Sequence, residues 1–348
     1  MAKKTEEKLN YAQEQRRLKE NGPEKLYFLW GPEDYLREHY LEQLKKLCLP
    51  EGEDSFSFKR LNGPELDPLE LANAIDAVPF LSERSFVELR GIDVNRQKDG
   101  DRLVKILSDI PDYCTVVFVQ GAEYEPDGRI KLVKSLRSMS REIRFTQQNQ
   151  GDLVRWVAKR FAALGKGIEL EAAQRLLFIS GDLMNRLIPE IEKIAAFAKG
   201  DKVTVADVET VAIHIPEAVI FEMTELISQR KINNALATLA ELLMDKDNEP
   251  IAMLAILGTQ MRRLYGAKLA QERKLGSQYL MKTCGCKTDY HVSKMMQAAR
   301  GYTLDQLKQA VKLCAEGDVR MKSSAGDERE ILKEIVFRIA AGESHGQG

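Results

Sequence analysis

The first 150 residues alternate short apolar runs with amphipathic stretches. The apolar runs are short enough, and rich enough in aromatic and β-branched residues, to be strands; they cover 25–30, 55–61, 85–89, 115–119 and 143–146. Amphipathic patterns typical of helices lie between them, at 34–47, 67–77 and 102–108. Strands that alternate with helices predict βαβ units and a mostly parallel sheet covered by helices. The run 115–119 is apolar on both faces and is the expected central strand.

After about Gly151 the strand patterns give way to helical ones. Apolar residues recur at helical spacing along one face from Leu183 to Ala198. Pro189 lies inside this pattern, so we expect the helix to be kinked or split there. Further helical patterns cover 217–229, 232–244, 251–271, 304–317 and 327–340.

These patterns predict an α/β plus all-α fold class. We place an α/β domain at 23–147, a small helical domain at 148–212 and a larger all-helical domain at 213–341. An N-terminal extension (1–22) and a flexible tail (342–348) flank them. A length of 348 residues is in keeping with two or three domains.

The charge balance excludes a chain drawn to nucleic acid by bulk electrostatics, because the formal net charge is −1. No run approaches the roughly 20 apolar residues of a membrane-spanning helix. Residues 1–20 mix lysines with glutamates and contain no apolar signal region, so we expect a cytoplasmic protein. The 5 cysteines are scattered, as is usual for reduced thiols in the cytosol.

A phosphate-binding loop would lie at Gly31–Tyr35, between the first strand and the first helix. Such a loop needs the pattern G-x-x-x-x-G-K-[ST], whose backbone N–H groups and lysine hold the phosphates. The segment Gly31-Pro32-Glu33-Asp34-Tyr35 has one glycine, no lysine and two carboxylates that would repel a triphosphate. We interpret Glu33 and Asp34 as acids at a helix N-terminus.

Other catalytic and cofactor patterns are missing from the sequence. The 4 histidines lie in separate segments, no Cys/His set has zinc spacing, and no strand is followed by G-x-G-x-x-G. We therefore predict no catalytic residue, no metal site and no cofactor.

An ordered set of segments resembles the bacterial DNA polymerase III delta subunits. The segment 27–36, YFLWGPEDYL, is similar to the family's first strand and loop, and 78–87, VPFLSERSFV, is similar to its P-F-[FL]-S-x-[RK]-[RK] segment. Similar segments follow in the family's order, at 181–183, 190–193, 220–221, 235–236, 260–262, 297–300 and 318–323. The resemblance runs from about Lys25 to Ala341.

The resemblance implies an AAA+ plan of RecA-like α/β domain, helical lid and helical collar, in agreement with the three parts inferred above. It implies a clamp-loader subunit that has lost nucleotide binding and is not an enzyme by itself, but an accessory subunit of a DNA-directed DNA polymerase. Met184 stands where ATPase relatives carry a lid arginine. Ser140-Arg141-Glu142 is the nearest match to their S-R-C segment, and we interpret it as chance.

The resemblance also maps a clamp-binding pair of apolar residues onto Phe80 and Leu81. Pro79 on one side and the polar Ser82-Glu83-Arg84 on the other would leave a short apolar projection between helix and strand. The alternative is that both residues are core residues leading into the strand at Ser85. The implied partners are the sliding clamp (beta subunit), the tau/gamma and delta prime subunits through the collar, and primed DNA.

Direct DNA contact is a weaker hypothesis, because the chain is nearly neutral. The candidates form a basic cluster of five residues: Arg262, Arg263, Lys268, Arg273 and Lys274. In an amphipathic helix such residues more often form a solvated face. The apolar stripe 251–257 is expected to pack against other subunits.

Two other functions stay open at this point. An AAA+ ATPase with an unorthodox loop would turn over ATP. A helical scaffold unrelated to replication would bind no clamp, and would leave the segment 79–84 unexplained.

Overall fold

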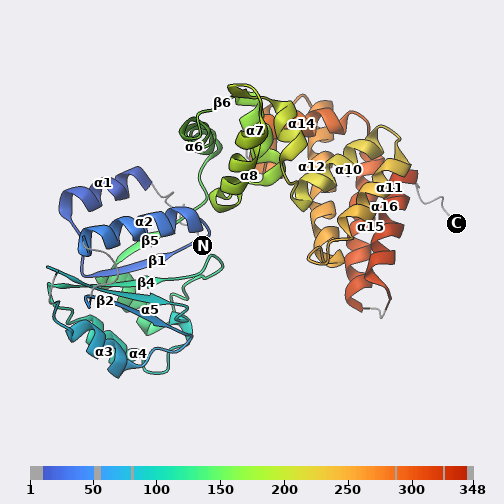
Figure 1. Cartoon of the computed structure of the whole chain (residues 1–348). Coiled ribbons are helices and arrows are strands. Elements are labelled where there is room, and N and C mark those ends of the chain that lie inside the picture. The colour runs from blue at the N-terminus through green and yellow to red at the C-terminus, as the bar shows by residue number, and fades with distance from the viewer. Residues whose placement is uncertain (1–10, 51–55, 80–81, 287, 324–325, 343–348) are drawn as a thin grey trace. The chain divides into compact units, whose positions relative to one another are not determined.

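A computed structural model describes residues 11–50, 56–79, 82–286, 288–323 and 326–342 (Figure 1). The chain divides into two compact units: residues 1–148 with 183–185, and residues 149–182 with 186–348. The finer division of the second unit into lid and collar at residue 212 stays a prediction.

The first unit is built on a five-stranded parallel sheet in the order β2-β3-β4-β1-β5. Its strands are β1 (Leu26–Trp30), β2 (Phe58–Asn62), β3 (Ser85–Arg90), β4 (Cys114–Val119) and β5 (Arg141–Arg144). Every residue of β4 is buried, and β4 is the middle strand. The predicted parallel sheet and its predicted central strand are therefore confirmed.

Helices cover both faces of this sheet (Figure 1). They are α1 (Tyr11–Asn21), α2 (Asp34–Cys48), α3 (Pro68–Asp76), α4 (Gly100–Leu107) and α5 (Lys131–Met139), with a 3₁₀ turn at Val94–Arg96. Figure 1 shows α2 on one face and α3, α4 and α5 on the other, where their apolar residues form a core with β1, β3 and β4. The helices α1 and α5 carry no assignment from the sequence pattern.

The second unit is helical apart from two short paired strands, β6 (Gly167–Ile168) and β7 (Lys202–Val203). Its helices are α6 (Gln150–Ala163), α7 (Leu170–Ser180), α8 (Met184–Phe197), α9 (Val205–Val211), α10 (Pro216–Ser228), α11 (Ile232–Leu242), α12 (Pro250–Glu272), α13 (Ser277–Cys284), α14 (Asp289–Ala299), α15 (Leu304–Ser323) and α16 (Glu328–Ala341). The expectation that strands end before Gly151 misses the β6–β7 pair, whose strands are only two residues long. The α/β plus all-α fold class is confirmed.

Two expectations about the second unit need correction. Pro189 lies inside α8 and does not split it, and Leu187, Ile191 and Ile194 on the apolar face of this helix are buried. Most of the stability of a helix within a protein comes from packing of its apolar face, and this packing offsets the hydrogen bond that a proline removes. A kink at Pro189 stays a prediction. The apolar stripe 251–257 was expected to pack against other subunits, but Met253, Leu254 and Leu257 lie in the core of the second unit itself.

Within the described residues, no helix combines the length and the apolar character that a membrane crossing requires.

Candidate functional site

The loop between β1 and α2 is short and closely packed. It consists of Gly31, Pro32 and Glu33, and α2 begins directly afterwards at Asp34. Gly31 has a φ of +116°, and a Cβ at this position would lie 2.5 Å from the carbonyl oxygen of Phe145 and 2.8 Å from its nitrogen. Glycine is required here because the loop lies against the backbone that follows β5.

Two backbone N–H groups at this loop donate to carbonyls of the chain itself. The N–H of Glu33 donates to the carbonyl of Phe145 at 3.0 Å, and the N–H of Asp34 donates to the carbonyl of Pro32 at 3.1 Å. Pro32 has no N–H to offer. A phosphate-binding loop directs such N–H groups toward its ligand, so these contacts leave the loop without that arrangement.

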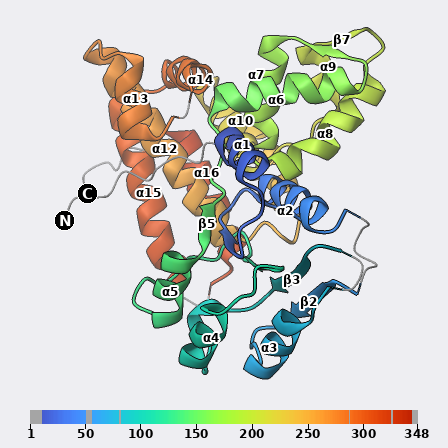
Figure 2. The same ribbon diagram turned by 90° about the vertical axis from the view of Figure 1, so that its left-hand side faces the viewer.

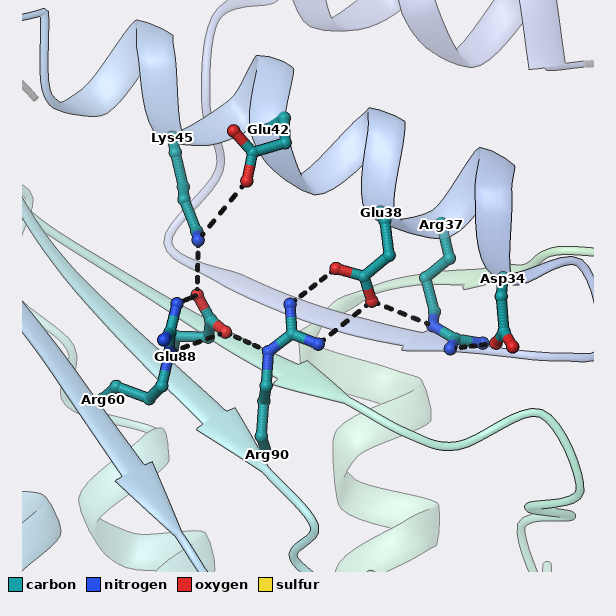
Figure 3. A network of polar contacts seen from close by, with 8 residues as sticks. All are labelled: Asp34, Arg37, Glu38, Glu42, Lys45, Arg60, Glu88 and Arg90. Carbon is teal, nitrogen blue, oxygen red and sulfur yellow. Dashed lines mark hydrogen bonds and ion pairs between the residues drawn. The ribbon is translucent and has the colours of Figure 1, made fainter. Parts of the chain in front are cut away.

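An arginine from α2 closes the loop further. Arg37 Nη1 donates to the carbonyl of Gly31 at 2.7 Å, and its guanidinium pairs with the Asp34 carboxylate (Figure 3). The side chain of Arg37 is only 6% exposed, so this cation is directed inward. The Glu33 side chain is fully buried. Asp34, one of the two acids that the sequence assigned to a helix N-terminus, thus pairs with a guanidinium that also binds the loop backbone.

We predict that Gly31→Ala destabilises the first unit strongly. The added Cβ meets backbone atoms that cannot rotate away, and the positive φ adds strain, so we expect a loss of about 3 kcal/mol in the free energy of unfolding. Gly63→Ala is the matched control, because Gly63 has a φ of +126° and a Cβ added there would have no atom within 4 Å. The control should lose about 1 kcal/mol. Chemical denaturation measures both, and equal losses would contradict the packing argument.

A buried carboxylate links α2 to the sheet farther along the same helix. Glu88 of β3 is fully buried, and Lys45 Nζ of α2 lies 2.8 Å from one of its oxygens (Figure 3). Arg60 Nε of β2 lies 3.1 Å from the other oxygen, and Arg90 pairs with both Glu88 and Glu38. Burial by itself would raise the pKa of Glu88, but hydrogen bonds from Lys45 and Arg90 hold it below its ordinary value. This network anchors α2 and therefore the closed loop.

The segment before β3 contains the predicted clamp-binding pair. Phe80 and Leu81 lie outside the described residues. On one side of them α3 ends at Asp76, and Val78 is 74% exposed. On the other side Ser82 Oγ donates to the carbonyl of Arg84 at 2.7 Å and lies 2.7 Å from Ser57 Oγ. The described flanks therefore bracket the pair with an exposed apolar residue and a hydrogen-bonded turn.

A second exposed apolar residue lies next to this turn. Phe56 precedes Ser57 and is 86% exposed. The carbonyl of Ser57 accepts a hydrogen bond from the N–H of Phe86, which aligns residues 56–57 with the start of β3. The sequence pattern placed Phe56 inside the predicted strand 55–61, whereas β2 begins only at Phe58, so its exposure was not expected.

Two of the five residues of the predicted basic cluster line a cavity. Arg262 and Arg263 line a cavity in the second unit together with Lys308, which lies far along the sequence. Lys268, Arg273 and Lys274 are not among the residues that line it. Lys308 was missed because only the packing of α12 against α15 brings it near the arginines.

Of two positions compared with ATPase relatives, Arg141 has a structural role. Arg141 of β5 pairs with Glu14 of α1, so it holds the N-terminal helix to the sheet. Tyr11 Oη links the same helix to α2, because it lies 2.6 Å from His39 Nδ1. Met184 is the first residue of α8 and offers no cation.

Comparison with known proteins decides the family. Residues 27–146 match the model of the DNA polymerase III delta subunit, and residues 217–339 match the model of its C-terminal domain. The chain belongs to the DNA polymerase III delta subunit family. Among curated delta subunits, that of Bacillus subtilis is 24% identical over 332 residues, which cover 92% of this chain and 94% of the relative. A probable delta subunit of Aquifex aeolicus is 22% identical over 341 residues, which cover 93% of this chain and 95% of the relative.

A solved member of the delta family supports the fold. The Bacillus subtilis DNA clamp loader delta protein superposes with a TM-score of 0.51 at 22% identity, over 95% of this chain and 99% of that one. The family resemblance inferred from the ordered segments is confirmed.

Proposed function

We propose that this chain is a clamp-loader delta subunit that binds the sliding clamp of DNA polymerase III and opens the ring for loading onto primed DNA. Membership of the delta family along both units carries the proposal. The relative from Bacillus subtilis that shares the fold is itself called a clamp loader delta protein.

The clamp contact in this proposal is the apolar pair Phe80 and Leu81. In sequence the pair lies between α3 and β3, close to Val78, which exposes an apolar side chain to solvent. Opening a closed ring requires that the pair bind the open clamp more tightly than the closed clamp, because equal affinity for both forms shifts no equilibrium. The chain then contributes binding energy to the opening step.

The chain performs this step without hydrolysing ATP itself. The closed loop at Gly31–Asp34 supports this, because the Glu33 N–H donates to the carbonyl of Phe145 and the Arg37 guanidinium is directed to the Gly31 carbonyl and the Asp34 carboxylate. ATP-dependent control belongs in this proposal to the tau/gamma and delta prime subunits, which would meet the chain through its C-terminal helices. The chain is then an accessory subunit of the polymerase, active in the cytoplasm.

DNA enters the proposal through the assembly, and the basic cluster is the candidate for backbone contact. Arg262, Arg273 and Lys274 are exposed, and Arg263 and Lys268 are half-buried. Contacts of such residues to phosphates would weaken as the salt concentration rises.

A clamp-release assay tests the proposed function. We expect excess chain to release a bacterial sliding clamp from nicked circular DNA without any nucleotide, because the binding energy itself favours the open ring. ATP turnover by the chain alone should stay at the background rate in the same preparation. Failure to bind the clamp would contradict the proposal, and measurable ATP turnover would favour an ATPase with an unorthodox loop.

A further inference from the structure

A cavity of about 620 Å³ lies between α12, α13 and α15 of the second unit. Figure 2 shows these three helices together, and α12 packs against both of the others. Its volume is within the range of small-molecule sites, roughly 300–1,000 Å³. Nothing in the proposed clamp contact involves it.

The cavity is lined by three cations and no carboxylate. Arg262 and Arg263 come from α12, and Lys308 comes from α15. Arg262 Nη2 donates to Thr259 Oγ1 at 2.9 Å, and Arg263 Nε donates to the carbonyl of Cys284 at 3.1 Å. Across the described part of the chain, none of the three cations forms an ion pair with an acidic side chain. The cavity therefore carries a net positive charge. Arg262 and Arg263 each have further guanidinium N–H groups besides the one that donates to Thr259 or to Cys284.

The remaining lining includes two tyrosines and two aliphatic residues. Tyr265 of α12 and Tyr279 of α13 are both half-buried and line the cavity, together with Leu269 and Val311. Arginine forks match phosphate oxygens in geometry and charge. Aromatic faces of this kind stack on nucleobases, and stacking contributes about 1–3 kcal/mol per base.

We propose that this cavity binds a nucleoside polyphosphate, with its phosphates on Arg262, Arg263 and Lys308 and its base against Tyr279. Three cations line one cavity, and this arrangement suits a ligand whose negative charges lie close together, as in a chain of phosphates. A single strand of DNA carries one charge per nucleotide and needs a track of cations. The other basic residues of the cluster, Lys268, Arg273 and Lys274, do not continue the cavity. The site is separate from the closed loop at Gly31, so the proposal does not depend on the clamp function.

Titration calorimetry of the full chain with ATP, GTP and inorganic triphosphate tests the proposal. The informative variant is Arg262→Gln/Lys308→Gln, because Arg263 also holds α13 through Cys284 and its loss would disturb the fold. We expect that double variant to bind ATP roughly 30-fold more weakly than the wild type. The matched control Arg273→Gln removes a nearby exposed cation outside the cavity and should bind as the wild type does.

A second variant separates base recognition from charge. Tyr279→Leu should weaken ATP and GTP roughly 10-fold while leaving inorganic triphosphate unchanged. The proposal is overturned if no nucleotide binds at millimolar concentration. It is equally overturned if ATP binding survives Arg262→Gln/Lys308→Gln, or if oligothymidylate binds the cavity and nucleotides do not. Circular dichroism of each variant confirms that the helices remain folded.

Discussion

Replacing Phe80 and Leu81 together with alanine is expected to weaken binding of a bacterial sliding clamp by about 10²–10³-fold. Burying each of these side chains contributes roughly 1.5–3 kcal/mol, and anchors of this kind dominate protein interfaces. Surface plasmon resonance with immobilised clamp measures the loss. Most of it should appear as faster dissociation, because truncating an interface side chain changes the off-rate more than the on-rate.

The control for this experiment is another exposed pair of the same residue types. Leu170 is 64% exposed and Phe197 is 49% exposed, and both belong to the second unit. Leu170→Ala/Phe197→Ala should leave clamp affinity unchanged. If Phe80 and Leu81 are core residues instead, their double variant will lose several kcal/mol of stability, because each truncation leaves a cavity. A large fall in the melting temperature together with unchanged clamp affinity would therefore contradict the assignment of Phe80 and Leu81 to the clamp interface.

Glu88→Gln is expected to cost about 4 kcal/mol of folding free energy. Removing one partner of a buried ion pair leaves the other charge uncompensated, which typically costs 3–5 kcal/mol. Here the stranded group is Lys45, whose side chain is only 5% exposed. Arg60 and Arg90 can turn toward solvent more readily, since they are 39% and 32% exposed. Urea denaturation followed by circular dichroism gives the difference.

Lys45 offers a matched control through its second acidic neighbour. Glu42 lies 3.6 Å from Lys45 Nζ but is 55% exposed, so Glu42→Gln should cost less than about 1 kcal/mol. A Glu88→Gln loss no larger than that of Glu42→Gln would contradict the assigned role of Glu88.

The difference in folding free energy between the wild type and Glu88→Gln is expected to depend on pH. The pKa of Glu88 is lowered in the folded chain, so its stabilising contribution is fully present above the unfolded value of about 4.3. That contribution is lost as the pH falls below this value and through the folded pKa. The gap between wild type and Glu88→Gln should therefore be constant from pH 8 to 6 and narrow below about pH 4.5.

The sequence predicted the sheet better than its edges. The run at 115–119 was recognisable as the central strand because a strand covered on both faces is apolar throughout. The edge strand β5 begins at Arg141 and Glu142, which pair with Glu14 and with Trp30 Nε1. Those polar partners come from distant parts of the chain, so the apolar pattern placed the strand two residues too late. The helix α1 was not predicted because few of its residues are apolar, and Leu18 is its one buried residue.

The site was predictable in outline and not in detail. The missing lysine and second glycine indicated that the loop at Gly31 is no phosphate cradle. The ion pair of Asp34 and Arg37 was not predicted, although their spacing of one helical turn is one at which ion pairs form. The hydrogen bond from Arg37 to the Gly31 carbonyl depends on how α2 is oriented relative to the end of β1, which the sequence pattern does not specify. Lys308 could not be found from sequence, because only helix packing brings it beside Arg262 and Arg263.

The closed loop also limits how the Gly31 position could regain nucleotide binding over evolutionary time. Introducing a lysine alone would leave the Glu33 N–H on Phe145 and the Arg37 guanidinium on Gly31. A working cradle would need a longer loop, a displaced arginine and a new partner for the Phe145 carbonyl, all at once. Each change by itself would weaken the fold before any phosphate was bound, so the loss of the cradle is not reversible by single replacements.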